Sequence, residues 1–513
     1  MPAWVPRRAA STASAAVGAI FLLPLIAALA HPGLVLPFKL GAAALVVTSA
    51  LAPRPGLYAL ALLLPFSASM ERWFGGMPGA AGVTDALLLA FLAGASWRLA
   101  WPRDVRPSHL AAPALVLLAA VLTSTIVEIR LLQRVTPGVP LLPELWRYLT
   151  SEYWTTAREF PVLHQAVRWT CWLVLAVYVE GIVAATDSRA RDVSVWVLAG
   201  MAGAALTVTS VVGFVLGSEA PAAVAMDVIV RGRVSVLQPD VNAAGSYFAL
   251  FLLPAVVLGI RRGARWLPAV AVPIVGFAFL AARSRAAFAA VVCVSCVAAL
   301  AHLRRVTPIA AGPSRAVRTA LILTVVAVVG GGGLFLVTSR SNVGPGAAVE
   351  FRIETTRIAV EAMRRYPAFG VGLGDYVRST RRFITEDFPS MRVHAPNGEN
   401  AHNNFLQIAV ELGVPALVVF LWLVGPVIVT GIRGTPGTVP SPELEGMACG
   451  LAAFLASALL GHPLLIPQVG VAFFAALGMT AGLLPRRPPS ERTRLVALLA
   501  AAGYVASLVW RLT

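Results

Sequence analysis

The sequence carries little charge for its length. Of its 513 residues only 13% are Asp, Glu, Lys or Arg, whereas soluble domains carry about 25%. Hydrophobic residues make up 58%, and the mean hydropathy is +0.78. These values exclude a soluble enzyme and a disordered chain.

Lysine and cysteine are also scarce. Lys39 is the one lysine among 41 basic residues. Cys171, Cys293, Cys296 and Cys449 all lie in apolar runs, which excludes a disulfide scaffold. The C-x-x-C of Cys293 and Cys296 has no further ligand in its flanks, so it favours small buried side chains over a redox or zinc pair.

What the sequence has in abundance is apolar runs of about 20 residues, the length that a helix needs to cross hydrocarbon. We therefore predict an all-α, polytopic transmembrane helix bundle of about 12–15 spans. The expected spans lie near 12–30, 34–52, 55–69, 83–100, 109–127, 163–185, 193–217, 241–260, 266–282, 285–302, 319–338, 403–431, 446–461, 467–484 and 495–511. The first could pass for a signal peptide, but the many spans after it favour an uncleaved helix.

Arginine predicts the orientation of these spans. Starting at the N-terminus, every second loop is basic, as cytoplasmic loops are. Three longer segments, about 128–162, 218–240 and 339–402, then face the other side. They nevertheless contain arginine: Arg231 and Arg233 lie in the second, nine arginines including Arg352 lie in the third, and Arg285 lies at the same membrane edge.

Cations near hydrocarbon cost a few kcal/mol, which an anionic ligand at that face would offset. A diphosphate suits this role because a guanidinium can bind two phosphate oxygens at once. For Arg378, Arg381 and Arg382 the alternative is a solvated basic patch on anionic lipid.

The segment 339–402 is predicted to be partly helical. Residues from Glu350 to Tyr366 have an amphipathic helical pattern, which Pro367 ends. Gly370, Gly372 and Gly374 follow, and no strand precedes them as a dinucleotide fingerprint would require. The three glycines instead indicate a tight turn or a close backbone approach to a lipid-linked ligand.

Two histidines flank a polar turn directly before the expected span at 403–431. His394 is typical of a helix cap, whereas His402 stands at the mouth of the span on the arginine-rich side. There an imidazole could remove a proton from a sugar hydroxyl. His462, in a short loop on the same side, is a secondary candidate. No metal-binding spacing is present, so we expect no metal.

Several motifs together resemble the O-antigen ligase and polymerase superfamily over about 231–430. The ligase pattern is His, then Asn, Ser or Gln, nine residues, Gly, two residues, then Gly, Thr or Tyr. His402, Asn403 and Gly413 match it, but Ala416 departs at the last position, which weakens the choice of ligase over polymerase. Three further motifs match. Arg233, or Arg231 in its place, stands with Pro239 and Asn242, and Ser284 stands with Arg285. The last motif is Arg352 followed by Gly370, Gly372 and Gly374.

The resemblance implies a bacterial inner-membrane glycosyltransferase with a cytoplasmic N-terminus and a periplasmic site. Its donor is a glycan on undecaprenyl diphosphate, and no cofactor takes part. By position, Arg233, Arg285 and Arg352 would bind the diphosphate, with Arg231 as the alternative to Arg233. His402 would be the base, and Asn403, Asn242, Gly370, Gly372 and Gly374 would support the site.

The expected organisation has four parts. Residues 1–230 form N-terminal transmembrane helices, 231–338 a core carrying the diphosphate-binding arginines, 339–402 the periplasmic loop, and 403–513 the C-terminal helices. The expected partners are membrane lipids, the lipid-linked donor and a lipid A–core or glycan acceptor, with no nucleic acid.

Three functions remain open. O-antigen ligation to lipid A–core stands first, and polymerisation of lipid-linked repeats stands second, with protein O-glycosylation as a lesser variant. A lipid-linked saccharide transporter is the alternative of another class, but transporters tend to place ionisable residues at the membrane midplane.

Overall fold

The computed structural model describes most of the chain. The described residues are 7–30, 34–67, 69–70, 80–99, 108–135, 138, 140, 143, 146–147, 161–185, 187–230, 240–262, 266–306, 345–435, 438–485 and 490–512. Across these residues all regular structure is helical and no strand forms, which confirms the all-α prediction.

Twelve helices, one of them a short 3₁₀ turn, make up the first part of the described fold. They are α1 (Arg7–Ala30), α2 (Leu36–Leu51), α3 (Pro53–Leu63), η1 (Leu64–Phe66), α5 (Ala80–Leu99), α6 (Ala111–Val135), α8 (Pro161–Ala184), α9 (Arg189–Leu216), α10 (Pro221–Val230), α11 (Val241–Arg262), α12 (Trp266–Ala281) and α13 (Arg285–Val306).

The remaining described helices follow residue 344. They are α15 (Pro345–Arg365), α16 (Tyr376–Thr380), η3 (Arg381–Phe383), α17 (Pro389–His394), α18 (Asn404–Leu412), α19 (Val414–Arg433), α20 (Pro442–Ala458), η4 (Pro463–Leu465), α21 (Pro467–Leu483) and α22 (Glu491–Leu512). The expected amphipathic helix at 350–366 is confirmed as part of α15.

Six described helices are long and apolar enough to cross a membrane, and the chain is a polytopic membrane protein. These candidate spans are 111–131, 162–184, 189–216, 241–261, 414–433 and 491–509, and six shorter apolar helices accompany them. The expected span at 319–338 lies outside the described residues.

The expectation of one continuous span over 403–431 is wrong, because the helix breaks at Gly413. This glycine has φ 90°, a conformation that disfavours any residue with a Cβ, and an added Cβ would lie 2.3 Å from the carbonyl oxygen of Ala368. The amide of Val414 donates to the carbonyl of Pro367 at 2.9 Å. The span therefore begins at Val414, and α18 is a separate short helix.

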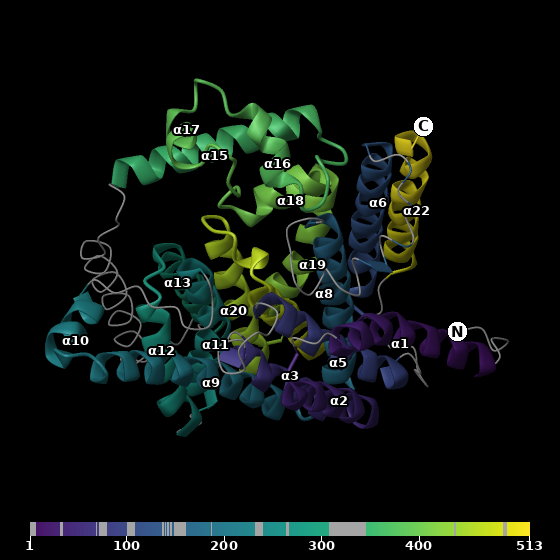
Figure 1. Ribbon diagram of the computed structural model, residues 1–513. Helices are drawn as coiled ribbons and strands as arrows, with labels where there is room; N and C mark the ends of the chain where they lie inside the picture. Colours follow the sequence, from purple (N-terminus) through teal and green to yellow (C-terminus); the bar gives the residue numbers. More distant parts are fainter. Residues whose placement is uncertain are drawn as a thin grey trace.

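The apolar helices pack into one bundle with α11, α20, α21 and α8 at its centre. Helix α11 packs on α20 and α21 on α8, while α22 lies along α6 (Figure 1). Three buried carboxylates in the bundle are matched by arginines, because a lone charge there is costly. Asp85 pairs with Arg168 at 3.1 Å, Asp192 with Arg54, and Glu445 with Arg261.

Residues 345–412, which we call the distal segment, lie at one end of this bundle (Figure 1). The distal segment has a small apolar core of its own, separate from that of the bundle. Its members are Ile358, Ala359, Ala362, Tyr376, Phe383, Met391, Ala395, Ala401 and Val410. Glu354 of α15 ties this core together, because its carboxylate accepts from the amides of Ser390 (3.1 Å) and Met391 (2.7 Å) at the start of α17.

Candidate functional site

The start of α18 is fixed by two consecutive asparagines. The Asn403 side chain accepts hydrogen bonds from the amides of Phe405 (2.9 Å) and Leu406 (3.1 Å), and so caps α18. The Asn404 side chain accepts from the amide of Leu464 at 3.1 Å, which ties α18 to η4 in the bundle. His402 and His462 immediately precede these two anchored segments, and their ring centroids lie 4.9 Å apart.

The backbone of His402 is strained. Its φ is 49°, and non-glycine residues in this region carry a cost that tends to persist at functional sites. The His402 ring contacts Phe351 of α15 edge to face, with the centroids 5.7 Å apart. His402 therefore lies between α15 of the distal segment and the α20–η4 connection of the bundle.

Burial is the main cause that keeps the His402 imidazole neutral at pH 7. The pKa of His402 is lowered to about 4 by burial and then by His462 and Arg352, while Glu399 and Asp240 act in the opposite direction. Burial also lowers the pKa of His462, although Asp240 and Glu399 act in the opposite direction. A neutral imidazole has a lone pair with which to accept a proton.

Two arginines belong to the same neighbourhood. Arg352 lies half-buried on α15, and Arg285 is the first residue of α13. Burial lowers the pKa of Arg352, and the positive charge of Arg285 lowers it further. Arg352 also acts on the pKa of both histidines. Arg352 thus lies within electrostatic range of both Arg285 and His402, which are far from each other in the sequence.

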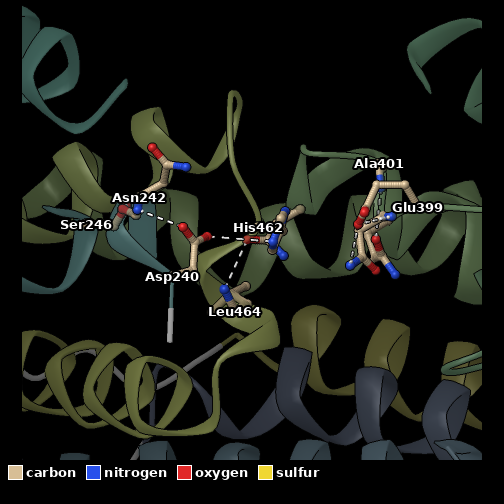
Figure 2. Close-up of polar contacts among 10 residues, drawn as sticks. Asp240, Asn242, Ser246, Glu399, Ala401, His462 and Leu464 are labelled. Carbon is tan, nitrogen blue, oxygen red and sulfur yellow. Dashed lines mark hydrogen bonds and ion pairs between the residues drawn. The ribbon is translucent and has the colours of Figure 1, made fainter. Parts of the chain in front are cut away.

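The other two expected phosphate ligands, Arg231 and Arg233, lie outside the described residues. Asn242 is described in the first turn of α11, where its backbone amide donates to Asp240 Oδ1 at 2.8 Å. The second oxygen of Asp240 lies 3.7 Å from His462 Nε2 (Figure 2). The start of α11 therefore reaches the histidine pair through Asp240.

Gly370, Gly372 and Gly374 lie at the opposite end of α18 from His402. All three have positive φ, between 71° and 118°. The amide of Gly372 donates to the Glu411 carbonyl at 3.1 Å, and that of Gly374 to the Glu411 side chain at 3.0 Å. A Cβ on Gly370 would lie 2.4 Å from the Glu411 carbonyl oxygen. Gly370 thus lies close against the backbone of α18, whereas a Cβ on Gly372 would meet the side chain of Glu128 on α6.

Sequence reasoning gave no role to two acids of this site, Asp240 and Glu399, and it ranked His462 second. An Asp directly before an apolar helical run is a recognisable helix N-cap signal, but that signal does not reveal a histidine partner. The described part of the chain contains no group of three or more His, Cys, Asp or Glu side chains arranged to hold a metal ion.

Comparison with known proteins gives one match. Residues 269–421 match the family model described as O-antigen ligase, and this region contains Arg285, Arg352 and His402. No curated protein and no solved structure matches the chain. Over residues 269–421, this match supports the resemblance of the chain to the O-antigen ligase and polymerase superfamily.

Proposed function

We propose that this protein is a membrane glycosyltransferase that moves a glycan from undecaprenyl diphosphate to a sugar hydroxyl, most simply O-antigen ligation to lipid A–core. Its site would face the periplasm from the bacterial inner membrane. The observation that carries the proposal is the gathering of two guanidinium groups and one neutral imidazole where the distal segment meets the bundle. The family match supports the class of donor.

In this proposal Arg285 and Arg352 bind the diphosphate. Arg352 is half-buried and Arg285 is exposed; their like charges repel each other, and a bound anion would relieve that repulsion. As the glycosidic bond breaks, its electron pair leaves with the lipid diphosphate. The guanidinium groups neutralise the developing negative charge, so the lipid diphosphate becomes a good leaving group without a metal ion.

His402 acts as the base. It accepts the proton of the acceptor hydroxyl while that oxygen forms the new bond to the anomeric carbon. Direct displacement by a single acceptor oxygen inverts the anomeric carbon. Because Arg352 lowers the pKa of His402, a diphosphate that neutralises Arg352 would raise it, so donor binding prepares the base for the acceptor.

Polymerisation of lipid-linked repeats is the second candidate, and Ala416 favours it. The family's ligase pattern has Gly, Thr or Tyr at this position, whereas Ala416 lies fully buried in the bundle core. The donor site and the base would be the same in both reactions. The difference lies in the acceptor alone.

The decisive experiment reconstitutes the purified protein with a lipid-linked glycan and two competing acceptors, lipid A–core and a second lipid-linked repeat. We expect glycosylated lipid A–core, with activity retained in EDTA. Extended lipid-linked glycan would instead identify a polymerase. No product with either acceptor would overturn the transferase proposal and favour transport.

The same assay tests the phosphate site. Arg285→Gln and Arg352→Gln should each weaken inhibition by inorganic pyrophosphate about tenfold or more, since hydrogen bonds to charged groups contribute about 1.5–3 kcal/mol. Arg392→Gln is the control, because Arg392 is exposed on α17. Unchanged inhibition in both site variants would remove the diphosphate-binding role.

A further inference from the structure

A second imidazole accompanies the proposed base. His462 lies in the connection between α20 and η4, and its ring is tilted by 55° to that of His402 with the centroids 4.9 Å apart. The two rings come from opposite sides of the junction between distal segment and bundle. His462 Nδ1 is buried and has no hydrogen-bond partner among the described residues.

The other ring nitrogen of His462 faces a fixed carboxylate. Asp240 Oδ2 lies 3.7 Å from His462 Nε2, and Figure 2 shows the carboxylate turned toward the ring. Asp240 cannot easily turn away, because its other oxygen accepts from the Asn242 amide at the start of α11. Its negative charge is therefore held at the Nε2 edge of the His462 ring.

The charged groups around the pair are arranged unequally. Arg352 of α15 lowers the pKa of both histidines. Glu399 of the distal segment raises the pKa of both. Asp240 is an ion-pair partner of His462 but acts on His402 only as the weakest of several charges. A positive charge is consequently better compensated on His462 than on His402.

We propose that His462 and Asp240 form a proton relay behind His402, in which the proton taken from the acceptor passes on to His462 and is stabilised there by the Asp240 carboxylate. This inference rests on the proposed function and deepens it. His462 and Asp240 act through His402, so both are positioning residues and do not touch the substrate.

The step conserves protons and charge. The acceptor O–H bond breaks as its oxygen bonds to the anomeric carbon, and the electron pair of the broken glycosidic bond leaves with the lipid diphosphate. The proton moves to His402 and then to His462, giving an imidazolium next to the Asp240 carboxylate. It returns to solvent or to the departing diphosphate before the next turnover.

Two substitutions test the relay. His462→Gln should lower kcat about 10–100-fold, within the range of proton-transfer effects, while the donor KM changes less than twofold. Asp240→Asn keeps a good helix cap but loses the charge. It should lower kcat and move the acid limb of the pH–rate profile to lower pH, because Asp240 favours the protonated form of His462.

The two changes should also depend on each other. In the His462→Gln background, Asp240→Asn should lose most of its effect on both kcat and the acid limb. His394→Gln is the matched control, because His394 lies exposed on α17 with its ring 6.4 Å from that of Phe351. It should behave as wild type.

The outcomes separate this inference from the proposed function. If His402→Ala abolishes transfer but His462→Gln and Asp240→Asn keep the wild-type kcat and pH profile, the relay is wrong and the function stands. Loss of kcat with an unmoved acid limb in Asp240→Asn would also overturn the relay, because a purely structural defect gives that result. If His402→Ala retains wild-type transfer, the base assignment itself fails.

Discussion

The two ends of α18 are both rich in polar groups, but they hold those groups differently. At its N-terminal end, His402 has a strained backbone, His462 Nδ1 has no hydrogen-bond partner within the described chain, and Arg352 is electrostatically close to Arg285. At its C-terminal end, the buried Glu411 side chain accepts from the Gln407 side chain at 2.6 Å and from the Gly374 amide at 3.0 Å.

This difference indicates that the N-terminal end of α18 serves the proposed reaction and that its C-terminal end stabilises the fold. Strain, unpaired polar atoms and close like charges all cost free energy, and proteins keep them where a ligand or a reaction compensates. Hydrogen bonds that satisfy a buried carboxylate stabilise the fold instead. We therefore expect substitutions at the N-terminal end of α18 to affect transfer, and substitutions at its C-terminal end to affect stability.

The largest expected effect belongs to His402→Ala. Loss of the base should lower the transfer rate by about 10²–10⁴-fold, while the melting temperature in detergent stays within a few degrees because the His402 side chain is not part of the apolar core. His394→Ala should change neither quantity. If His402→Ala transferred the glycan at the wild-type rate, His402 would not be the base and would have only a structural role at the start of α18.

A smaller effect, on stability alone, is expected at Gly370. Gly370→Ala combines a positive φ with a contact of 2.4 Å to the Glu411 backbone, so it should lower the free energy of unfolding by about 3–5 kcal/mol. Gly425→Ala in α19 is the control, because a Cβ there meets nothing within 4 Å. Equal melting temperatures for the two variants would contradict the view that the glycines clamp α18.

The smallest expected effect is a pH dependence at Glu411. Burial raises the pKa of Glu411 from 4.5 to about 7, although hydrogen bonds from Gly374 and Gln407 oppose the shift. A raised carboxyl pKa means that the folded state binds the proton more tightly. The contribution of Glu411 to stability is then present below about pH 4.5 and lost as the pH rises through 7.

Glu411→Gln should remove this dependence. Relative to the variant, the wild type should lose about 2–3 kcal/mol of stability between pH 4.5 and pH 8, since each pKa unit corresponds to about 1.4 kcal/mol. Melting temperatures of both proteins across that range measure the difference. Parallel curves would show that Glu411 titrates alike in the folded and unfolded states.

The sequence predicted the features of this fold that depend on local pattern. Apolar runs gave the helical membrane architecture, and the helical period with Pro367 gave α15 and its end. The break at Gly413 was missed because the apolar pattern continues through it. A single glycine does not reveal a positive φ, which depends here on the backbone of Ala368 packing against it.

The candidate site was predictable only in part, for the same reason. Arginines on one expected membrane face and the motif around His402 indicated a shared anion site before any contact was known. The partnership of Asp240 with His462 joins residues more than 200 positions apart. No local pattern encodes such a contact, because it arises from how α11, α20 and α18 pack.

The two apolar cores have a consequence for the proposed transfer reaction. His402 and Arg352 belong to the distal segment and Arg285 and His462 to the bundle, and α18 contributes side chains to both cores. A shift of the distal segment against the bundle would change both the spacing of His402 and His462 and the spacing of Arg352 and Arg285. We expect the hydrogen bond between Asn404 and Leu464 to oppose such a shift and so to hold the proposed base and its partners in place.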